Sequence, residues 1–123
     1  MKGPGVKILI ADDHDLVRDT LVAFVEASGE IRTSTAPDLE TACALVTSDG
    51  PFDLVLLDLN MPGMNGLDGL ERALELDGSP RVALISGQAS REIAERALDC
   101  GAAGFVPKTL PAKSLVNAIK FMA

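Results

Sequence analysis

Short aliphatic runs alternate along the chain with longer amphipathic stretches. The aliphatic runs fall at residues 6–11, 31–36, 54–57, 82–85 and 105–106. Runs of this length that are rich in β-branched and aliphatic residues predict β-strands. The run at 54–57 has no polar residue, which is typical of a central parallel strand covered on both faces. The more polar run at 31–36 indicates a strand nearer the edge of the sheet.

Between these runs, apolar residues recur at helical spacing, which predicts five amphipathic helices. Their expected buried stripes are Val17, Leu21, Phe24, Val25 and Ser28; Leu39, Ala42, Cys43 and Val46; Leu67, Leu70 and Leu74; Ile93, Ala94, Ala97 and Leu98; and Leu115, Ile119 and Met122. Pro37 suits a first helical position, and Asn65 and Ser90 are predicted N-caps. Gly29 and Gly101 are expected to follow the last turns of their helices.

The order of these elements predicts the fold class. Five strand–helix units in succession imply an α/β fold with a parallel sheet, right-handed crossovers and helices on both faces. At this size we expect the flavodoxin-like, doubly wound five-stranded sheet with strand order 2-1-3-4-5. We expect one domain over residues 1–123, because the length fits a single domain and 47% of the residues are hydrophobic.

Composition excludes several classes of function. There are 11 basic and 18 acidic residues, and the net charge of -7 argues against binding to a nucleic-acid backbone. No apolar run approaches the ~20 residues of a membrane-spanning helix, and the N-terminus has no signal-peptide pattern. Cys43 and Cys100 are too far apart for a CxxC metal motif and fit free thiols in a reducing cytosol. We therefore expect a cytoplasmic protein.

Chemically active residues stand directly after the predicted strands. Asp12 and Asp13 follow the first strand, Asp58 ends the third, Ser86 follows the fourth and Lys108 follows the fifth. The carboxyl ends of parallel strands meet at one edge of the sheet, so these side chains are expected to share one crevice. Each residue alone has a plain explanation as a helix cap or a loop residue. Together, three carboxylates, a hydroxyl and a lysine fit a magnesium-assisted attack of a carboxylate on a phosphoryl group, which gives an acyl phosphate.

Three segments carry a resemblance to a known family. Residues 8–14 (Ile-Leu-Ile-Ala-Asp-Asp-His), 56–66 (Leu-Leu-Asp-Leu-Asn-Met-Pro-Gly-Met-Asn-Gly) and 101–108 (Gly-Ala-Ala-Gly-Phe-Val-Pro-Lys) resemble the receiver domain of bacterial two-component response regulators. The resemblance covers essentially the whole chain. The first and last segments are most similar to receivers that carry a LuxR-type helix-turn-helix output domain, and we expect no such output domain within these 123 residues.

The resemblance implies roles for the residues of the crevice. Asp58 would be the phosphoacceptor and Lys108 the cation that pairs with the phosphate. Asp12 and Asp13 would be the acidic pair that serves a Mg²⁺ or Mn²⁺ ion, with Asp13 as the more direct ligand. Asp58 and the backbone carbonyl of Asn60 would complete the metal site.

The resemblance also implies a switch. Ser86 would be the hydroxyl switch residue and Phe105 the aromatic one, and the signal would reach the face formed by the fourth helix, the fifth strand and the fifth helix. Gly87 and Gln88 would modulate the site, and Asn60 and Gln88 would control how water reaches the phosphorus. The implied partners are a sensor histidine kinase and, through the switching face, an output domain or a second copy of the chain. Nucleic acid and membrane are not expected as direct partners. We expect no enzymatic activity beyond the domain's own phosphorylation and dephosphorylation.

Other functions were weighed against this one. A phosphohydrolase of the haloacid dehalogenase type needs a second aspartate two residues after the nucleophile, where Asn60 stands, and a cap for which the chain has no room. A degenerate receiver that only binds proteins usually lacks an acidic residue, the acceptor or the lysine, and all are present here. The chain has no Trp or Tyr to stack on a flavin, which disfavours a flavodoxin. His14 is expected to be an ordinary helix-start residue rather than a phosphoryl carrier or a metal ligand.

Overall fold

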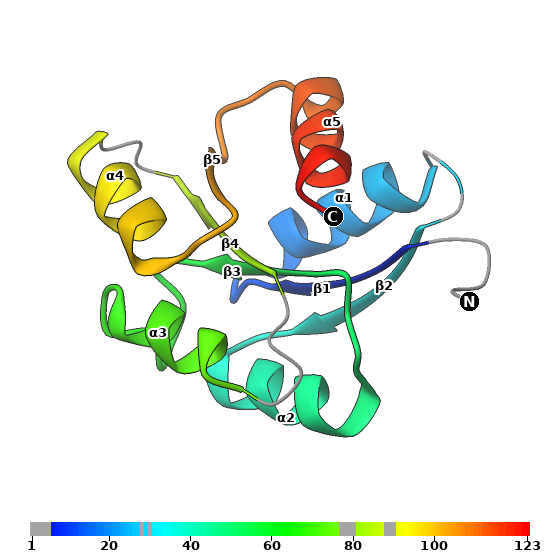
Figure 1. The fold of residues 1–123 in the computed structure, drawn as a ribbon. Coiled ribbons are helices and arrows are strands. Elements are labelled where there is room, and N and C mark those ends of the chain that lie inside the picture. The colour runs from blue at the N-terminus through cyan, green and yellow to red at the C-terminus, as the bar shows by residue number, and fades with distance from the viewer. Residues whose placement is uncertain (1–5, 28, 30, 77–80, 88–90) are drawn as a thin grey trace.

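One parallel five-stranded sheet organises the molecule. The computed structural model describes residues 6–27, 29, 31–76, 81–87 and 91–123. The strand order is β2-β1-β3-β4-β5, and helices cover both faces of the sheet (Figure 1), which confirms the predicted fold class. The strands are β1 (Val6–Ala11), β2 (Ile31–Ala36), β3 (Leu54–Asp58), β4 (Val82–Ser86) and β5 (Gly104–Pro107). The helices are α1 (Asp15–Ala27), α2 (Leu39–Asp49), α3 (Asp68–Leu74), α4 (Arg91–Cys100) and α5 (Ala112–Met122).

The sheet separates two hydrophobic clusters. On one face, Leu9, Val55 and Leu57 pack with the buried residues of α2, α3 and α4, and on the other face Leu54 and Leu56 pack with those of α1 and α5. Every residue of β3 is buried, as the continuous apolar run predicted, because successive side chains of a strand point to opposite faces and both faces are covered here. The polar strand β2 lies at the edge, also as predicted.

The predicted stripes of α2 and α5 are confirmed. Of the stripe predicted for α3, Leu70 is buried and Leu67 and Leu74 are partly buried. Helices α1 and α4 each leave one predicted residue exposed. Phe24 on α1 is 46% exposed and Leu98 on α4 is 52% exposed. Successive helical residues are about 100° apart around the axis. Val25 and Ala97 face the sheet, so their neighbours Phe24 and Leu98 point past it. Ser28 and the cap Ser90 lie outside the described residues.

Two predicted helix starts are wrong. α2 begins at Leu39, and Asp38 is its N-cap, because the Asp38 carboxylate accepts a hydrogen bond of 2.7 Å from the Thr41 backbone N–H. Pro37 therefore precedes the cap instead of opening the helix.

Asn65 is likewise not the N-cap of α3. Asn65 and Gly66 both adopt positive φ angles, 48° and 66°, so the chain enters the helical conformation only after them. The N-cap is Leu67. The Asn65 side chain instead donates a hydrogen bond of 3.0 Å to Asp68 in the first turn.

The register of the sheet brings the strand ends together. Ala11 is opposite Leu57, so Asp12 and Asp58, the residues that follow, are neighbours across the β1–β3 pair. Asp58 is opposite Ile85, and Ser86 is opposite Pro107, which precedes Lys108. This edge of the sheet therefore carries the acidic residues, the serine and the lysine that the sequence placed after the strands.

The loop after β3 is held against α2. The Leu39 backbone N–H donates a hydrogen bond of 3.1 Å to the Pro62 carbonyl. Gly63 has a φ of 91°, and a Cβ built on it would lie 3.0 Å from the Cβ of Leu39. Only glycine meets both demands without strain, so the turn at Gly63 fixes the path of the chain beyond Asp58. In the described part of the chain, no helix has the length and apolar character needed to cross a membrane.

Candidate functional site

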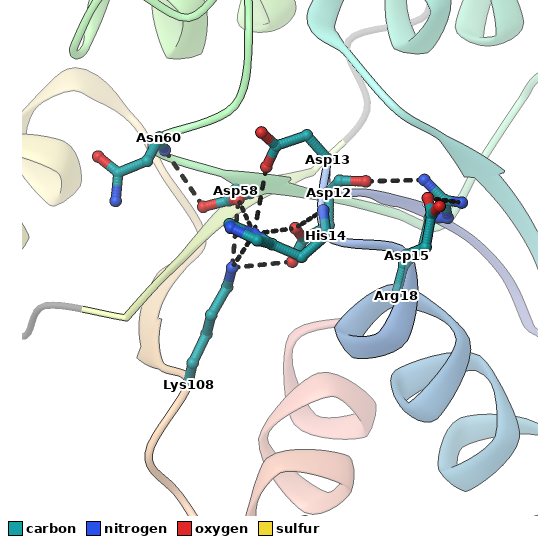
Figure 2. Close-up of polar contacts among 8 residues, drawn as sticks. All are labelled: Asp12, Asp13, His14, Asp15, Arg18, Asp58, Asn60 and Lys108. Atoms are coloured by element: carbon teal, nitrogen blue, oxygen red, sulfur yellow. Dashed lines mark hydrogen bonds and ion pairs between the residues drawn. The ribbon is translucent and has the colours of Figure 1, made fainter.

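Asp12 and Asp58 lie side by side at the carboxyl edge of the sheet, and both are fully buried. One oxygen of each is held by the backbone. The Asp12 Oδ1 accepts a hydrogen bond of 2.8 Å from the His14 N–H, and the Asp58 Oδ1 accepts one of 3.2 Å from the Asn60 N–H. The other oxygens face Lys108, whose Nζ is 2.9 Å from Asp12 Oδ2 and 3.1 Å from Asp58 Oδ2 (Figure 2). One ammonium thus bridges two buried carboxyl groups.

The surroundings push the two carboxyl groups in opposite directions. Burial raises the pKa of Asp58, and the charge of Asp12 adds to this effect, against the hydrogen bonds from Asn60 and Lys108. Burial also raises the pKa of Asp12, but the backbone hydrogen bond from His14 and the positive charge of Lys108 outweigh burial, and the pKa of Asp12 is lowered. For Lys108, burial alone would lower the pKa, and contact with Asp12 and Asp58 raises it instead. Lys108 therefore stays an ammonium at neutral pH.

Asp13 and His14 complete the crevice from its exposed side. The His14 Nδ1 lies 3.0 Å from Asp12 Oδ1, 3.2 Å from Asp13 Oδ1 and 3.6 Å from Asp58 Oδ2. One potential ligand atom from each of these four residues lies within 4.8 Å of the others. Figure 2 shows the ring of His14 between the carboxylates.

This donor set fits a small divalent cation. Three carboxylates share the crevice with one ammonium, which contacts two of them. The Asp12 Oδ2, although 2.9 Å from Lys108, makes no hydrogen bond of regular geometry. Carboxylate oxygens at short spacing are the ligands of Mg²⁺, which keeps several waters and takes one or two protein carboxylates. The backbone of Asn60 is in place beside Asp58, and its role as a carbonyl ligand stays a prediction.

Ser86 and Gly87 border Lys108, whereas Phe105 lies on β5. Ser86 is buried at the end of β4, and its carbonyl accepts a hydrogen bond of 2.7 Å from the Lys108 N–H. A Cβ on Gly87 would lie 4.0 Å from the Lys108 side chain, so Gly87 borders the same site. Phe105 on β5 is partly buried against the cluster of α2, α3 and α4. Gln88 lies outside the described residues, and the roles assigned to all these residues stay predictions.

Two residues at the site were missed by sequence reasoning. His14 was expected to be an ordinary helix-start residue, and its ring lies instead among the acidic side chains. Arg18, in the first turn of α1, donates to the Asp12 carbonyl at 2.9 Å and to the Asp15 carboxylate at 2.7 Å. Arg18 thereby ties the acidic loop to the helix, and the spacing of three residues from Asp15 is the signal that could have indicated it.

A family model and a curated relative match nearly the whole chain. Residues 8–120 match the model of the response regulator receiver domain. The glycerol metabolism activator of Pseudomonas putida is 37% identical over 116 residues, which cover 93% of this chain and 52% of that protein. The chain therefore spans about half the length of this relative.

Solved structures with this fold include close matches in length. The signal receiver domain of the putative response regulator NarL from Mycobacterium tuberculosis is 34% identical, with a TM-score of 0.83 and coverage of 97% of this chain and 96% of that one. A LuxR family DNA-binding response regulator from Silicibacter pomeroyi is 35% identical, also with a TM-score of 0.83, over 95% of this chain and 90% of that one.

The opposite pKa shifts predict opposite effects on stability. A raised pKa in the folded state means that stability falls as the pH rises from the unfolded value through the folded value, so ionised Asp58 destabilises the domain at pH 7. A lowered pKa means that ionised Asp12 contributes stability, which is lost as the pH falls through its folded value. In metal-free buffer at pH 7, we expect Asp58→Asn to raise the Tm and Asp12→Asn to lower it, each by about 2–5 °C.

Thermal unfolding in the presence of a chelator measures this pair directly. Asn is nearly isosteric with Asp, so packing is preserved in both variants. Shifts of the same sign would contradict the assignment of the destabilising charge to Asp58.

Proposed function

The chain belongs to the response regulator receiver domain family, and we propose that it is a phosphorylation-controlled signalling domain in which Asp58 accepts a phosphoryl group from a sensor histidine kinase. Receiver domains are signalling modules that bind Mg²⁺ at an acidic pocket and partner with histidine kinases. The observation that carries the assignment to Asp58 is its position. It is a buried carboxylate at a strand end, in contact with Lys108 and beside a second buried carboxylate.

In the proposed reaction, a carboxylate oxygen of Asp58 attacks the phosphorus of a phosphohistidine. The new O–P bond forms as the P–N bond breaks, and the electron pair leaves with the imidazole of the kinase. Lys108 is placed to pair with the phosphoryl oxygens, since its ammonium already contacts Asp58. Asp12, Asp13, Asp58 and the Asn60 carbonyl would hold Mg²⁺ or Mn²⁺, which when bound neutralises charge on the transferred group. Beyond this transfer and the later hydrolysis, we propose no enzymatic activity.

An apolar groove next to the crevice supports docking of the kinase from the side of α1. The groove lies between α1 and α5 and is lined by Leu16, Thr20 and Phe24 of α1, by Leu115 of α5, and by Lys108 and Leu110. Leu16 is 80% exposed and Phe24 is 46% exposed, so neighbouring apolar side chains of the groove are open to solvent, as at protein interaction sites. Lys108 belongs to both the groove and the crevice, so a protein seated in the groove would lie next to Asp58.

The signal is proposed to leave the crevice through Ser86 and Lys108. The added phosphoryl oxygens would pair with the hydroxyl and the ammonium, and the movement of Ser86 would let the partly buried ring of Phe105 pack further inward. The affected surface is α4-β5-α5, which presents the exposed Leu98 and Phe121. An output domain of LuxR type or a second copy of the chain would bind there. Asn60, Gly87 and Gln88 would set the lifetime of the acyl phosphate.

The limits of the domain and its location belong to the same proposal. A single receiver domain over residues 1–123 and a cytoplasmic location stay predictions.

Incubation with acetyl phosphate and Mg²⁺ tests the phosphoacceptor. We expect the intact mass of the wild type to increase by one phosphoryl group, and the mass of Asp58→Asn to stay unchanged. The exposed Asp99→Asn on α4 is the matched control and should gain mass like the wild type. A gain in Asp58→Asn would place the acceptor elsewhere. If no protein gains mass from acetyl phosphate or from a phosphorylated kinase, the chain is a degenerate receiver that acts by binding alone.

The groove predicts a difference between small and large phosphoryl donors. Phe24→Ala removes a ring from the groove and leaves Asp58 intact. We expect acetyl phosphate to phosphorylate this variant at the wild-type rate. Transfer from a histidine kinase that phosphorylates the wild type should be about tenfold slower, which corresponds to a loss of about 1.4 kcal/mol of binding free energy. Phe121→Ala removes an exposed ring from α5 and is the control that should not slow transfer. Equal slowing with both donors would argue against docking in the groove.

The proposed path of the signal through Ser86 and Lys108, here called the relay, predicts where phosphorylation changes the NMR spectrum. In the wild type, we expect phosphorylation to shift backbone amide signals across α4-β5-α5. Ser86→Ala and Lys108→Ala should greatly reduce these shifts, because each removes a partner of the phosphoryl oxygens. Ser114→Ala, an exposed change on α5, should leave them as in the wild type. Full-sized shifts in the two relay variants would mean that the signal takes another route.

A further inference from the structure

The ring of His14 occupies the acidic crevice, although the proposed phosphoryl transfer gives it no task. The backbone holds the residue in place on both sides. Its N–H donates to Asp12 at 2.8 Å, and its carbonyl accepts a hydrogen bond of 2.9 Å from the Arg18 N–H in the first turn of α1. The side chain is 59% exposed, while its Nδ1 faces the carboxylates (Figure 2).

The spacing around this nitrogen is that of ligands around a metal ion. Ligand atoms about 2.1 Å from an octahedral cation lie about 3.0 Å apart at neighbouring positions. The His14 Nδ1 is 3.0, 3.2 and 3.6 Å from oxygens of Asp12, Asp13 and Asp58. The nitrogen therefore lies where a further ligand of a cation bound by these three carboxylates would lie.

The Nδ1 lies among hydrogen-bond acceptors and near one donor. The carboxylates only accept hydrogen bonds, whereas the Lys108 Nζ, 3.5 Å away, only donates them. A bound cation would give the lone pair of Nδ1 and the carboxylate oxygens one common partner.

We propose that His14 is a nitrogen ligand of the cation site and gives this domain a preference for transition-metal ions such as Co²⁺ and Zn²⁺ over Mg²⁺. The proposal rests on the cation site of the proposed function. Imidazole suits transition metals, whereas carboxylate, carbonyl and water ligands suit Mg²⁺. A site of oxygen ligands alone would therefore favour transition-metal ions over Mg²⁺ less strongly than a site that includes His14.

The chain has a single histidine, which makes the test direct. In protein that carries no polyhistidine tag, the ¹⁵N signals of the imidazole belong to His14 alone. We expect stoichiometric Zn²⁺ to shift the Nδ1 signal and to leave it shifted in the presence of excess Mg²⁺. An Nδ1 signal that Zn²⁺ leaves in place would overturn the proposal.

Metal affinities of two variants complete the test, with Co²⁺ and Mg²⁺ each titrated calorimetrically. His14→Phe keeps a ring but removes the nitrogen. We expect the ratio of Co²⁺ affinity to Mg²⁺ affinity to fall at least tenfold in this variant. This magnitude is the lower end of the loss of affinity seen when groups that support metal ligands are removed. Asp13→Asn removes an oxygen ligand, and should weaken both ions without this fall in the ratio. Thermal unfolding checks that both variants are folded.

The outcomes separate this proposal from the proposed function. An equal change for both ions in His14→Phe overturns the role of His14, while Mg²⁺ binding and phosphorylation of Asp58 in the wild type would stand. Wild-type protein that binds neither ion would overturn the cation site itself.

Discussion

Two buried carboxyl groups that share one ammonium are the constraint on which the site depends. Asp12 and Asp58 are both removed from water, and Lys108 contacts both. Burying charge is costly unless each charge is paired, and here one positive group serves two negative ones. The imbalance falls on Asp58, whose pKa is raised, while Asp12 keeps the better hydrogen bonds. A divalent cation would supply the missing positive charge. Its binding would therefore offset the cost of burying the Asp58 charge, at the same place where the proposed phosphoryl transfer occurs.

The fold and most of this site could be predicted because both follow from periodicity and topology. The apolar run of β3 is typical of a strand covered on both faces, and strand–helix alternation indicated a parallel sheet. In a parallel sheet the carboxyl ends meet at one edge, which placed Asp12, Asp58 and Lys108 together before any distance was known. The structure adds the register, in which Ala11 lies opposite Leu57 and makes the two aspartates direct neighbours.

The remaining features depend on geometry that a sequence pattern does not contain. Phe24 and Leu98 have helical spacing, but the orientation of each helix on the sheet decides which side chains are covered, and here Val25 and Ala97 face the sheet. Asn65 is a good N-cap by residue type, yet its left-handed backbone delays the helix. The place of the His14 ring depends on a local turn, in which the His14 N–H bonds to Asp12, and on the contact of its Nδ1 with the same carboxylate, neither of which the residue types alone specify.

Lys108 connects the two surfaces of the proposed mechanism. Its ammonium contacts Asp58, its side chain lines the groove beside α1, and its backbone N–H is bonded to the Ser86 carbonyl at the end of β4. The groove lies between α1 and α5, since Leu115 of α5 lines it together with Leu16 and Phe24, whereas Phe105 packs on the opposite face of the sheet with α2, α3 and α4. On the proposed function, the kinase would therefore bind in the groove, and the ring of Phe105 would respond on the other face of the sheet. Helix α5 contributes to both the groove and the α4-β5-α5 surface, so the kinase and an output partner would share part of α5.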